Sequence, residues 1–135
     1  MNPITEIKNR LDTKHPDLKY EVEENSICVK PKNGNGFEVW FSDDGHEYTV
    51  GYEGWHQHFP TSELEEALDC FAFGFSDECR LKVIQRGSKT YKWQMQSLNN
   101  GKWVTFSTTG LIFSPFWRKA KVSYLSNNLI SAKNA

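Results

Sequence analysis

The feature that most constrains this chain is a pair of alternating stretches joined by a tight-turn signal. Apolar and polar residues alternate over 37–42, and the same period of two returns over 48–52. Asp43, Asp44 and Gly45 lie between the two stretches. A period of two places successive side chains on opposite faces of a strand, and Asp-Gly is a strong hairpin signal. These residues predict an antiparallel hairpin with one face in a hydrophobic core.

Other periodic segments predict further strands and two helices. Alternation continues over 18–23 and 91–96, the segments 27–29, 81–84 and 103–107 are further short strand candidates, and Asn99-Asn100-Gly101 is a second strong turn. Asn2 and Pro3 suit the start of an N-terminal helix, because Asn caps orphan N–H groups and Pro tolerates the first helical position. Ser62 with Glu65 forms a capping box ahead of a central helix over 62–75.

Together these patterns predict one α+β domain that covers residues 1–135. We expect one mostly antiparallel β-sheet of about six or seven strands, with an N-terminal helix and a central helix. The order along the chain is helix, strands, helix, strands. Residues 131–135 are expected to form a frayed tail.

The composition is that of an ordinary globular domain, with 135 residues of which 38% are hydrophobic and 24% charged. No apolar run approaches the roughly 20 residues that a membrane-spanning helix needs. The N-terminal residues lack the pattern of a secretory signal, so we expect a cytoplasmic protein. Cys28, Cys70 and Cys79 have no CxxC spacing and are interpreted as reduced thiols.

Charge is unevenly distributed along the chain although the net charge is only −1. Residues 1–67 carry 6 basic and 14 acidic residues, whereas 68–135 carry 10 basic and 3 acidic ones. Such asymmetry can mark a face that binds a charged partner. The alternative is that the two halves interleave in one sheet and pair their charges across strands.

The sharpest local motif is Trp55-His56-Gln57-His58-Phe59. In an extended segment His56 and His58 point to the same face and offer two imidazoles to one metal ion. A catalytic zinc usually takes three protein ligands. The spacing nominates none of the available third ligands, which are His46, Glu47, Glu53 and Asp69. The other interpretation is that Trp55 and Phe59 anchor the start of the central helix while the imidazoles bond backbone groups or face solvent.

Aromatic and basic residues are interleaved near the C-terminus. Trp117 and Arg118 follow Ser114-Pro115, where an irregular loop can expose them as interface anchors. Arg118, Lys119 and Lys121 form a compact basic patch that an acidic protein surface would complement. A tryptophan buried in the core is the equally plausible alternative for Trp117.

Residues 54–59, 63–68 and 107–119 together resemble a small family of uncharacterised bacterial single-domain proteins. Some bacterial proteins of this size and α+β layout resemble the immunity proteins of toxin systems. The resemblance implies that the protein neutralises a partner toxin by surface contact and has no catalytic residues.

We therefore expect a non-enzymatic module that binds a protein partner, with Trp117, Arg118, Lys119 and Lys121 in the contact surface. No nucleophile with a paired base is identifiable, and no cofactor is predicted. The alternative function is a small metal-dependent enzyme or metal-binding protein centred on His56 and His58. The low net charge argues against nucleic acid, and an exposed edge strand would allow a homodimer.

Overall fold

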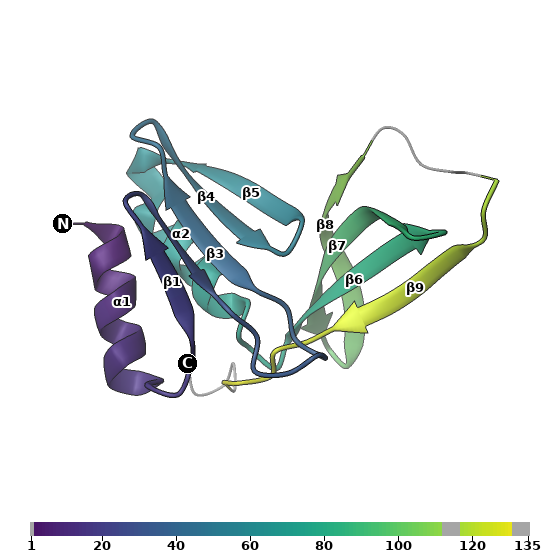
Figure 1. Ribbon diagram of the computed structural model, residues 1–135, viewed down its shortest axis with the longest axis horizontal. Coiled ribbons are helices and arrows are strands. Elements are labelled where there is room, and N and C mark those ends of the chain that lie inside the picture. The colour runs from purple at the N-terminus through teal and green to yellow at the C-terminus, as the bar shows by residue number, and fades with distance from the viewer. Residues whose placement is uncertain (1, 112–116, 131–135) are drawn as a thin grey trace.

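The computed structural model describes residues 2–111 and 117–130, which fold into two α-helices and two antiparallel β-sheets (Figure 1). The α+β class and both predicted helices are confirmed. The single sheet of six or seven strands is replaced by two sheets, with five and four strands among the described residues. Alternation reveals which segments are strands but not which strands pair, so it does not show where one sheet ends.

The first sheet follows the helix α1 (Pro3–Lys14) and is built from neighbours in sequence. Its strands lie in the order β1-β2-β3-β4-β5. They are β1 (Tyr20–Glu23), β2 (Ser26–Val29), β3 (Val39–Asp43), β4 (Glu47–Tyr52) and β5 (Trp55–Pro60). The predicted hairpin is β3–β4, in which Phe41 lies opposite Val50. Asn2 caps α1 as predicted, because its side chain accepts a hydrogen bond from the N–H of Ile4.

The central helix begins later than predicted. Thr61–Glu63 forms a 3-10 turn (η1), and α2 spans Leu64–Phe73. The predicted capping box does not form, since Ser62 lies inside the 3-10 turn and no side chain caps the start of α2.

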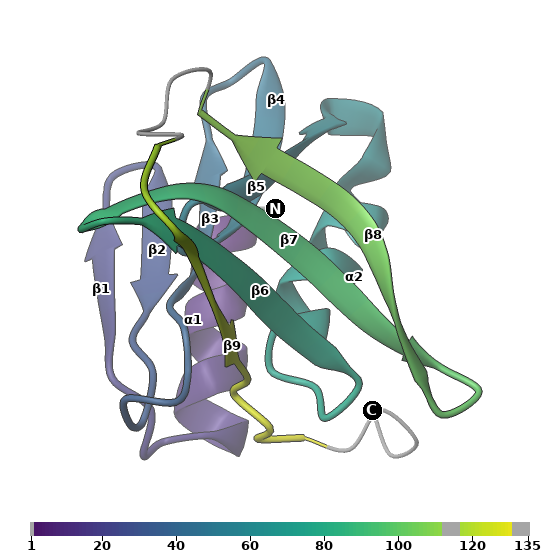
Figure 2. The same cartoon turned by 90° about the vertical axis from the view of Figure 1, so that its right-hand side faces the viewer.

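The second sheet contains all the strands that follow α2. They are β6 (Cys79–Arg86), β7 (Lys89–Asn99), β8 (Lys102–Gly110) and β9 (Ala120–Leu125), in the spatial order β8-β7-β6-β9. The turn Asn100-Gly101 has positive φ at both residues, as the sequence predicted for a tight hairpin. Strand β9 pairs with β6 and not with its sequence neighbour β8, so β9 and β8 lie at opposite edges of the sheet (Figure 2).

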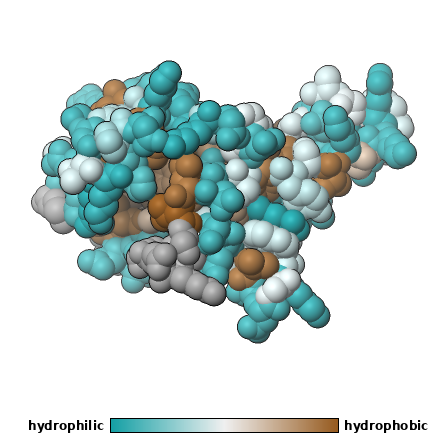
Figure 3. Space-filling model, turned by 90° about the horizontal axis from the view of Figure 1, so that it is seen from below, coloured by the Kyte–Doolittle hydropathy of each residue, from teal (hydrophilic) through white to brown (hydrophobic). Residues whose placement is uncertain are grey.

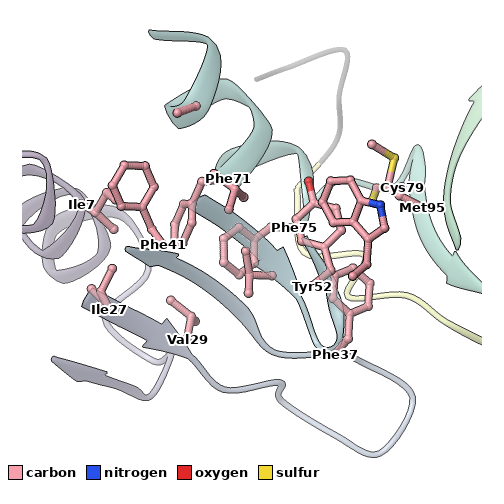
Figure 4. Packing of buried hydrophobic residues seen from close by; sticks show 14 of the residues in the cluster. Ile7, Ile27, Val29, Phe37, Phe41, Tyr52, Phe71, Phe75, Cys79 and Met95 are labelled. Atoms are coloured by element: carbon pink, nitrogen blue, oxygen red, sulfur yellow. The ribbon is translucent and has the colours of Figure 1, made fainter. Parts of the chain in front are cut away.

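The hydrophobic core lies between one face of the first sheet and the two helices (Figure 4). Ile7 of α1 and Phe71 of α2 meet Ile27 and Phe41 of the sheet there. The second sheet joins the same core through a smaller set of residues. Cys79, Leu81 and Met95 are buried in the cluster that also holds Tyr52 and the fully buried Trp55.

The two sheets also contact each other directly at the edge of the first. The backbone N–H of His56 in β5 donates to the hydroxyl of Thr109 in β8 (3.2 Å), and that hydroxyl also lies 3.4 Å from the carbonyl oxygen of His56. At His56, the backbone of the edge strand β5 is therefore already hydrogen-bonded within the molecule.

The segment after β9 ties distant parts of the fold together. The N–H of Ser126 donates to the carbonyl of Asn35 (2.8 Å), and Asn127 accepts a hydrogen bond from the N–H of Phe37 (3.0 Å). The amide of Asn127 donates in turn to the carbonyl of Gly74 at the end of α2 (2.9 Å). One asparagine thus links the β2–β3 loop to the central helix.

Two sequence predictions fall outside the described residues. They are the frayed tail 131–135 and the loop at Ser114-Pro115. Within 2–111 and 117–130, no helix is long and apolar enough to cross a membrane.

Candidate functional site

The face of the second sheet that points away from the core is the most distinctive surface of the molecule. In β6, buried Cys79, Leu81 and Val83 alternate with Arg80 and Lys82, which are only partly covered. Because alternate residues of a strand point to opposite faces, the apolar side chains enter the core and the two cations lie outside. We call the surface with Arg80 and Lys82 the outer face.

A group of side chains on the outer face, one or two from each of the four strands, surrounds Arg80. The guanidinium carbon of Arg80 lies 4.1 Å from the ring centre of Tyr124 in β9 and 4.5 Å from that of Trp103 in β8. Its Nε donates to Oε1 of Gln96 in β7 (2.6 Å), and Nε2 of Gln96 donates to the hydroxyl of Thr105 in β8 (3.0 Å). These five residues, Arg80, Gln96, Trp103, Thr105 and Tyr124, are called the Arg80 cluster.

The cluster holds the guanidinium in a fixed position. Two ring faces attract the cation, and Gln96 orients its Nε–H. Arginine has five N–H donors, and its planar fork matches the two oxygens of a carboxylate. Tyr124 is 50% exposed, so the cluster reaches the surface. The arrangement is suited to binding an aspartate or glutamate side chain of another molecule.

Charge on the second sheet has one sign only. All 17 acidic residues of the chain precede Cys79, whereas residues 79–125 contain nine Lys and Arg residues. Lys82 and Lys92 share the outer face with Arg80, since Lys82 lies opposite Gln94 and Lys92 lies opposite Ile84. The acidic and basic halves therefore occupy different sheets and do not interleave across strands, contrary to the alternative weighed from the sequence.

The predicted partner-binding residues lie beside this sheet. Trp117 is 73% exposed, so it is not a core residue. The carbonyl of Arg118 accepts a hydrogen bond from Arg86 (2.8 Å), and Lys121 lies opposite Gln85 in the β6–β9 pair. Lys119 precedes β9 and is exposed. All four residues thus lie where β9 begins, at the end of β6 away from Arg80.

The predicted histidine pair is adjacent in β5. The ring centres of His56 and His58 are 5.2 Å apart, so the two imidazoles share a face as the alternation predicted. Nδ1 of His58 lies 2.9 Å from the hydroxyl of Thr49 and 3.2 Å from a carboxylate oxygen of Glu47. Nδ1 of His56 lies 3.4 Å from the carbonyl of Gly54.

All of these contacts involve Nδ1. A neighbouring group that holds a histidine through one ring nitrogen orients the other ring nitrogen, here Nε2, for a metal ion. However, the part of the chain that the structure describes contains no group of three or more His, Cys, Asp or Glu residues placed to hold a metal ion. The metal site at His56 and His58 therefore stays a prediction with two ligands.

The three thiols do not form a reactive centre. Burial raises the pKa of Cys28 to about 12 and that of Cys70 to about 11, and it raises the pKa of Cys79 further still. The Cys28 thiol also donates to a carboxylate oxygen of Glu38 (3.2 Å), which Lys30 contacts at 3.1 Å. Protonated thiols are poor nucleophiles, and in the structure Cys28 makes a hydrogen bond to Glu38 while Cys70 and Cys79 pack in or against the core.

A separate apolar cleft of about 460 Å³ lies between α1 and α2. Its lining includes Ile7 and Leu11 of α1, Phe71 of α2, and Phe75 and Leu129 from the segments after α2 and β9. Seen from below, apolar side chains gather on this side of the molecule (Figure 3). None of the site residues predicted from the sequence lines the cleft.

Sequence reasoning missed the Arg80 cluster, although two signals were present. If the chain is divided at Cys79 when its charges are counted, the part from Cys79 onward contains basic residues and no acidic ones. The alternation of Arg80 and Lys82 with Leu81 and Val83 already places both cations on one face. The contacts of Arg80 had no such signal. Its contact with Tyr124 depends on the pairing of β9 with β6, and its contact with Trp103 depends on the strand order β8-β7-β6.

Comparison with protein-family models, curated proteins and solved structures found no similar protein.

Proposed function

We propose that this protein is a non-enzymatic binding module that holds an acidic surface of a partner protein against the outer face of its second sheet. The observation that carries the proposal is Arg80, whose guanidinium is held between two aromatic rings in a sheet without acidic residues. Trp, Tyr and Arg are the residue types that most often dominate the energy of protein interfaces.

The surroundings of Arg80 favour carboxylates over bases as ligands. A protein that binds single strands needs free ring faces on which bases stack. Here the guanidinium of Arg80 covers one face of both Trp103 and Tyr124. In addition, residues 1–78 carry 17 acidic and 6 basic residues, so the rest of the molecule repels a polyanion. An acidic patch on a protein meets the basic sheet without approaching the acidic one.

The proposed binding surface also includes the partner-binding residues predicted from the sequence. Trp117 supplies an exposed aromatic side chain, and Arg118, Lys119 and Lys121 supply further positive charge near the start of β9. An immunity-type protein, which neutralises a toxin by covering part of its surface, is the form of this function that the sequence resemblance suggests.

The experiment that tests the proposal combines capture with matched charge reversals. The protein is immobilised, retained proteins are identified from an extract of the source cells, and the affinity of the purified partner is then measured. The test variant is Lys82→Glu with Lys92→Glu on the outer face. The control is Lys14→Glu with Lys19→Glu, which makes the same change of charge at exposed positions of the first half.

We expect the outer-face variant to weaken binding by about tenfold or more and the control to leave it within about twofold. Raising the salt concentration from about 0.05 to 0.5 M should weaken binding of the parent protein, because it shortens the range of charge interactions. The proposal is wrong if both double variants bind equally well. It is also wrong if nuclease treatment releases the captured material, since the ligand would then be a nucleic acid.

A further inference from the structure

The second sheet ends at β8, whose backbone edge the proposed function does not use; the side chain of Thr109, near the end of this strand, is bonded to β5. Strand β8 pairs with β7 on one side, and no strand among the described residues pairs with it on the other. Unpaired N–H and C=O groups along such an edge form a template for another strand. Natural proteins usually protect long edges with charged side chains, with proline or with another element.

Strand β8 has few of these protections. Between Trp103 and Gly110 it contains neither a charged residue nor a proline. Val104 is 46% exposed and Phe106 is 66% exposed. A β-bulge lies at Phe106, because Thr105 pairs with Gln96 and Ser107 with Met95, which leaves Phe106 without a partner on β7. The bulge turns a large apolar side chain toward solvent at the middle of the edge.

The other edges of the two sheets are protected. Glu21 and Glu23 lie on β1, so two copies of that strand would bring like charges together. The edge of β5 is bonded to Thr109 through the backbone of His56. Strand β9 is shorter than β8 and carries Lys121. Of the edge strands that the structure describes, β8 is therefore the one with a long uncharged edge.

We propose that β8 pairs with β8 of a second copy in an antiparallel, two-fold symmetric dimer. The lack of charge on this edge favours a second copy over the acidic partner proposed above. An acidic partner finds no complementary charge along Trp103–Gly110, whereas a second copy presents the same uncharged Thr- and Ser-rich segment and meets no like charge there. A two-fold interface uses one patch twice, which an antiparallel pair of identical strands satisfies.

The dimer joins two four-stranded sheets into one eight-stranded sheet. The outer faces with their Arg80 clusters then lie side by side, and two acidic surfaces, or one repeated surface, can be bound at once. The dimer uses the backbone edge of β8 and the proposed function uses the side chains of the outer face, to which Trp103 and Thr105 of β8 also contribute, so each proposal has its own test.

A matched pair of variants tests the dimer. Val104 in β8 and Val122 in β9 are exposed to 46% and 45% and lie on opposite edges of the same sheet. Val104→Lys adds a charge at the proposed contact, and Val122→Lys adds the same charge elsewhere. The mass of each protein in solution is measured by light scattering after size-exclusion chromatography, over a wide concentration range at low and high salt.

We expect the parent and Val122→Lys to approach twice the monomer mass as concentration rises, and Val104→Lys to stay monomeric under the same conditions. Association should strengthen at high salt, because screening weakens the repulsion between the two basic sheets. Circular dichroism shows whether each variant is folded. Phe106→Lys replaces Val104→Lys if the latter does not fold.

Three results would overturn the dimer. The parent staying monomeric at all concentrations is the first. A loss of association in Val122→Lys equal to that in Val104→Lys is the second, because the contact would then lie elsewhere. Association that weakens with salt is the third, because it would indicate that the acidic half of one copy binds the basic half of another.

Discussion

Trp93 of β7 lies directly over Gly54, in the turn between β4 and β5. A Cβ atom at position 54 would be 2.4 Å from the indole ring. The absence of a side chain at Gly54 lets the second sheet approach the edge of the first at this point. Close packing of this kind makes the junction sensitive to a single added methyl group.

Gly54→Ala should therefore destabilise the protein by about 1–3 kcal/mol, the usual range for overpacking. Urea unfolding followed by tryptophan fluorescence measures the change in the free energy of unfolding. Gly34→Ala is the control, because no atom lies within 4 Å of a Cβ built there. A change of less than about 0.5 kcal/mol is expected for that variant. Equal stability of the two variants would show that the indole moves aside freely.

Stability should depend on pH through Glu38. The Cys28 thiol and the Lys30 ammonium hold the pKa of the Glu38 carboxyl below its ordinary value. A lowered pKa stabilises the fold above the unfolded-state pKa, near 4.3, and that contribution is lost as pH falls through the folded-state pKa. Glu38→Gln should cost about 0.5–1 kcal/mol at neutral pH.

The difference between Glu38→Gln and the parent should vanish once the pH is below the folded-state pKa of Glu38, because the carboxyl is then protonated in both states. Urea unfolding at a series of pH values provides the measurement. A difference that is the same at all pH values would mean that the carboxylate charge is not the source of the effect.

The native thiols should react slowly with Ellman's reagent. With pKa values of about 12 for Cys28 and about 11 for Cys70, the thiolate fractions at pH 8 are about 10⁻⁴ and 10⁻³. For an ordinary thiol of pKa near 8.5 the fraction is roughly a quarter. We expect labelling at least about 100-fold slower than for free cysteine in the native protein, and rapid labelling of all three thiols in denaturant. One fast thiol under native conditions would contradict the assigned burial.

Zinc or nickel titration separates the proposed binding module from the metal-dependent alternative. Two imidazoles without a third ligand among the described residues should bind either metal weakly, with no stoichiometric step at low micromolar concentration. His56→Ala with His58→Ala is titrated alongside the parent. Stoichiometric binding that the double variant abolishes would move the functional centre to β5 and direct the next assays to hydrolysis.

Local patterns predicted the elements of the fold because they depend on near neighbours. Alternation and the Asp-Gly turn gave β3 and β4 with their inward residues, and Asn2 capped α1 as expected. The same reasoning placed His56 and His58 on one face. Each of these features needs only the chain within a few residues of itself.

What the sequence did not reveal depends on distant pairing. The chain separates into two sheets because β5 pairs with none of the later strands that the structure describes. The meeting of Arg80 with Tyr124 requires β9 to pair with β6, which lies far from it in the sequence. The capping box failed for a different reason, since the chain enters α2 through a 3-10 turn. The sequence allowed Trp117 to be either an exposed or a core residue, because the answer depends on which strands lie next to it.

The pairing of β9 with β6 also sets the order in which the molecule can fold. Each strand of the first sheet pairs with its sequence neighbours, so that sheet can form as a series of short loop closures. The second sheet is complete only when Leu125 reaches Leu81, and Asn127 then closes onto Phe37 and Gly74. Contacts between residues so far apart in sequence slow folding. The rate-limiting step of folding is therefore expected to be the docking of the C-terminal strand, and until it docks the β6–β7–β8 meander has a second unpaired edge.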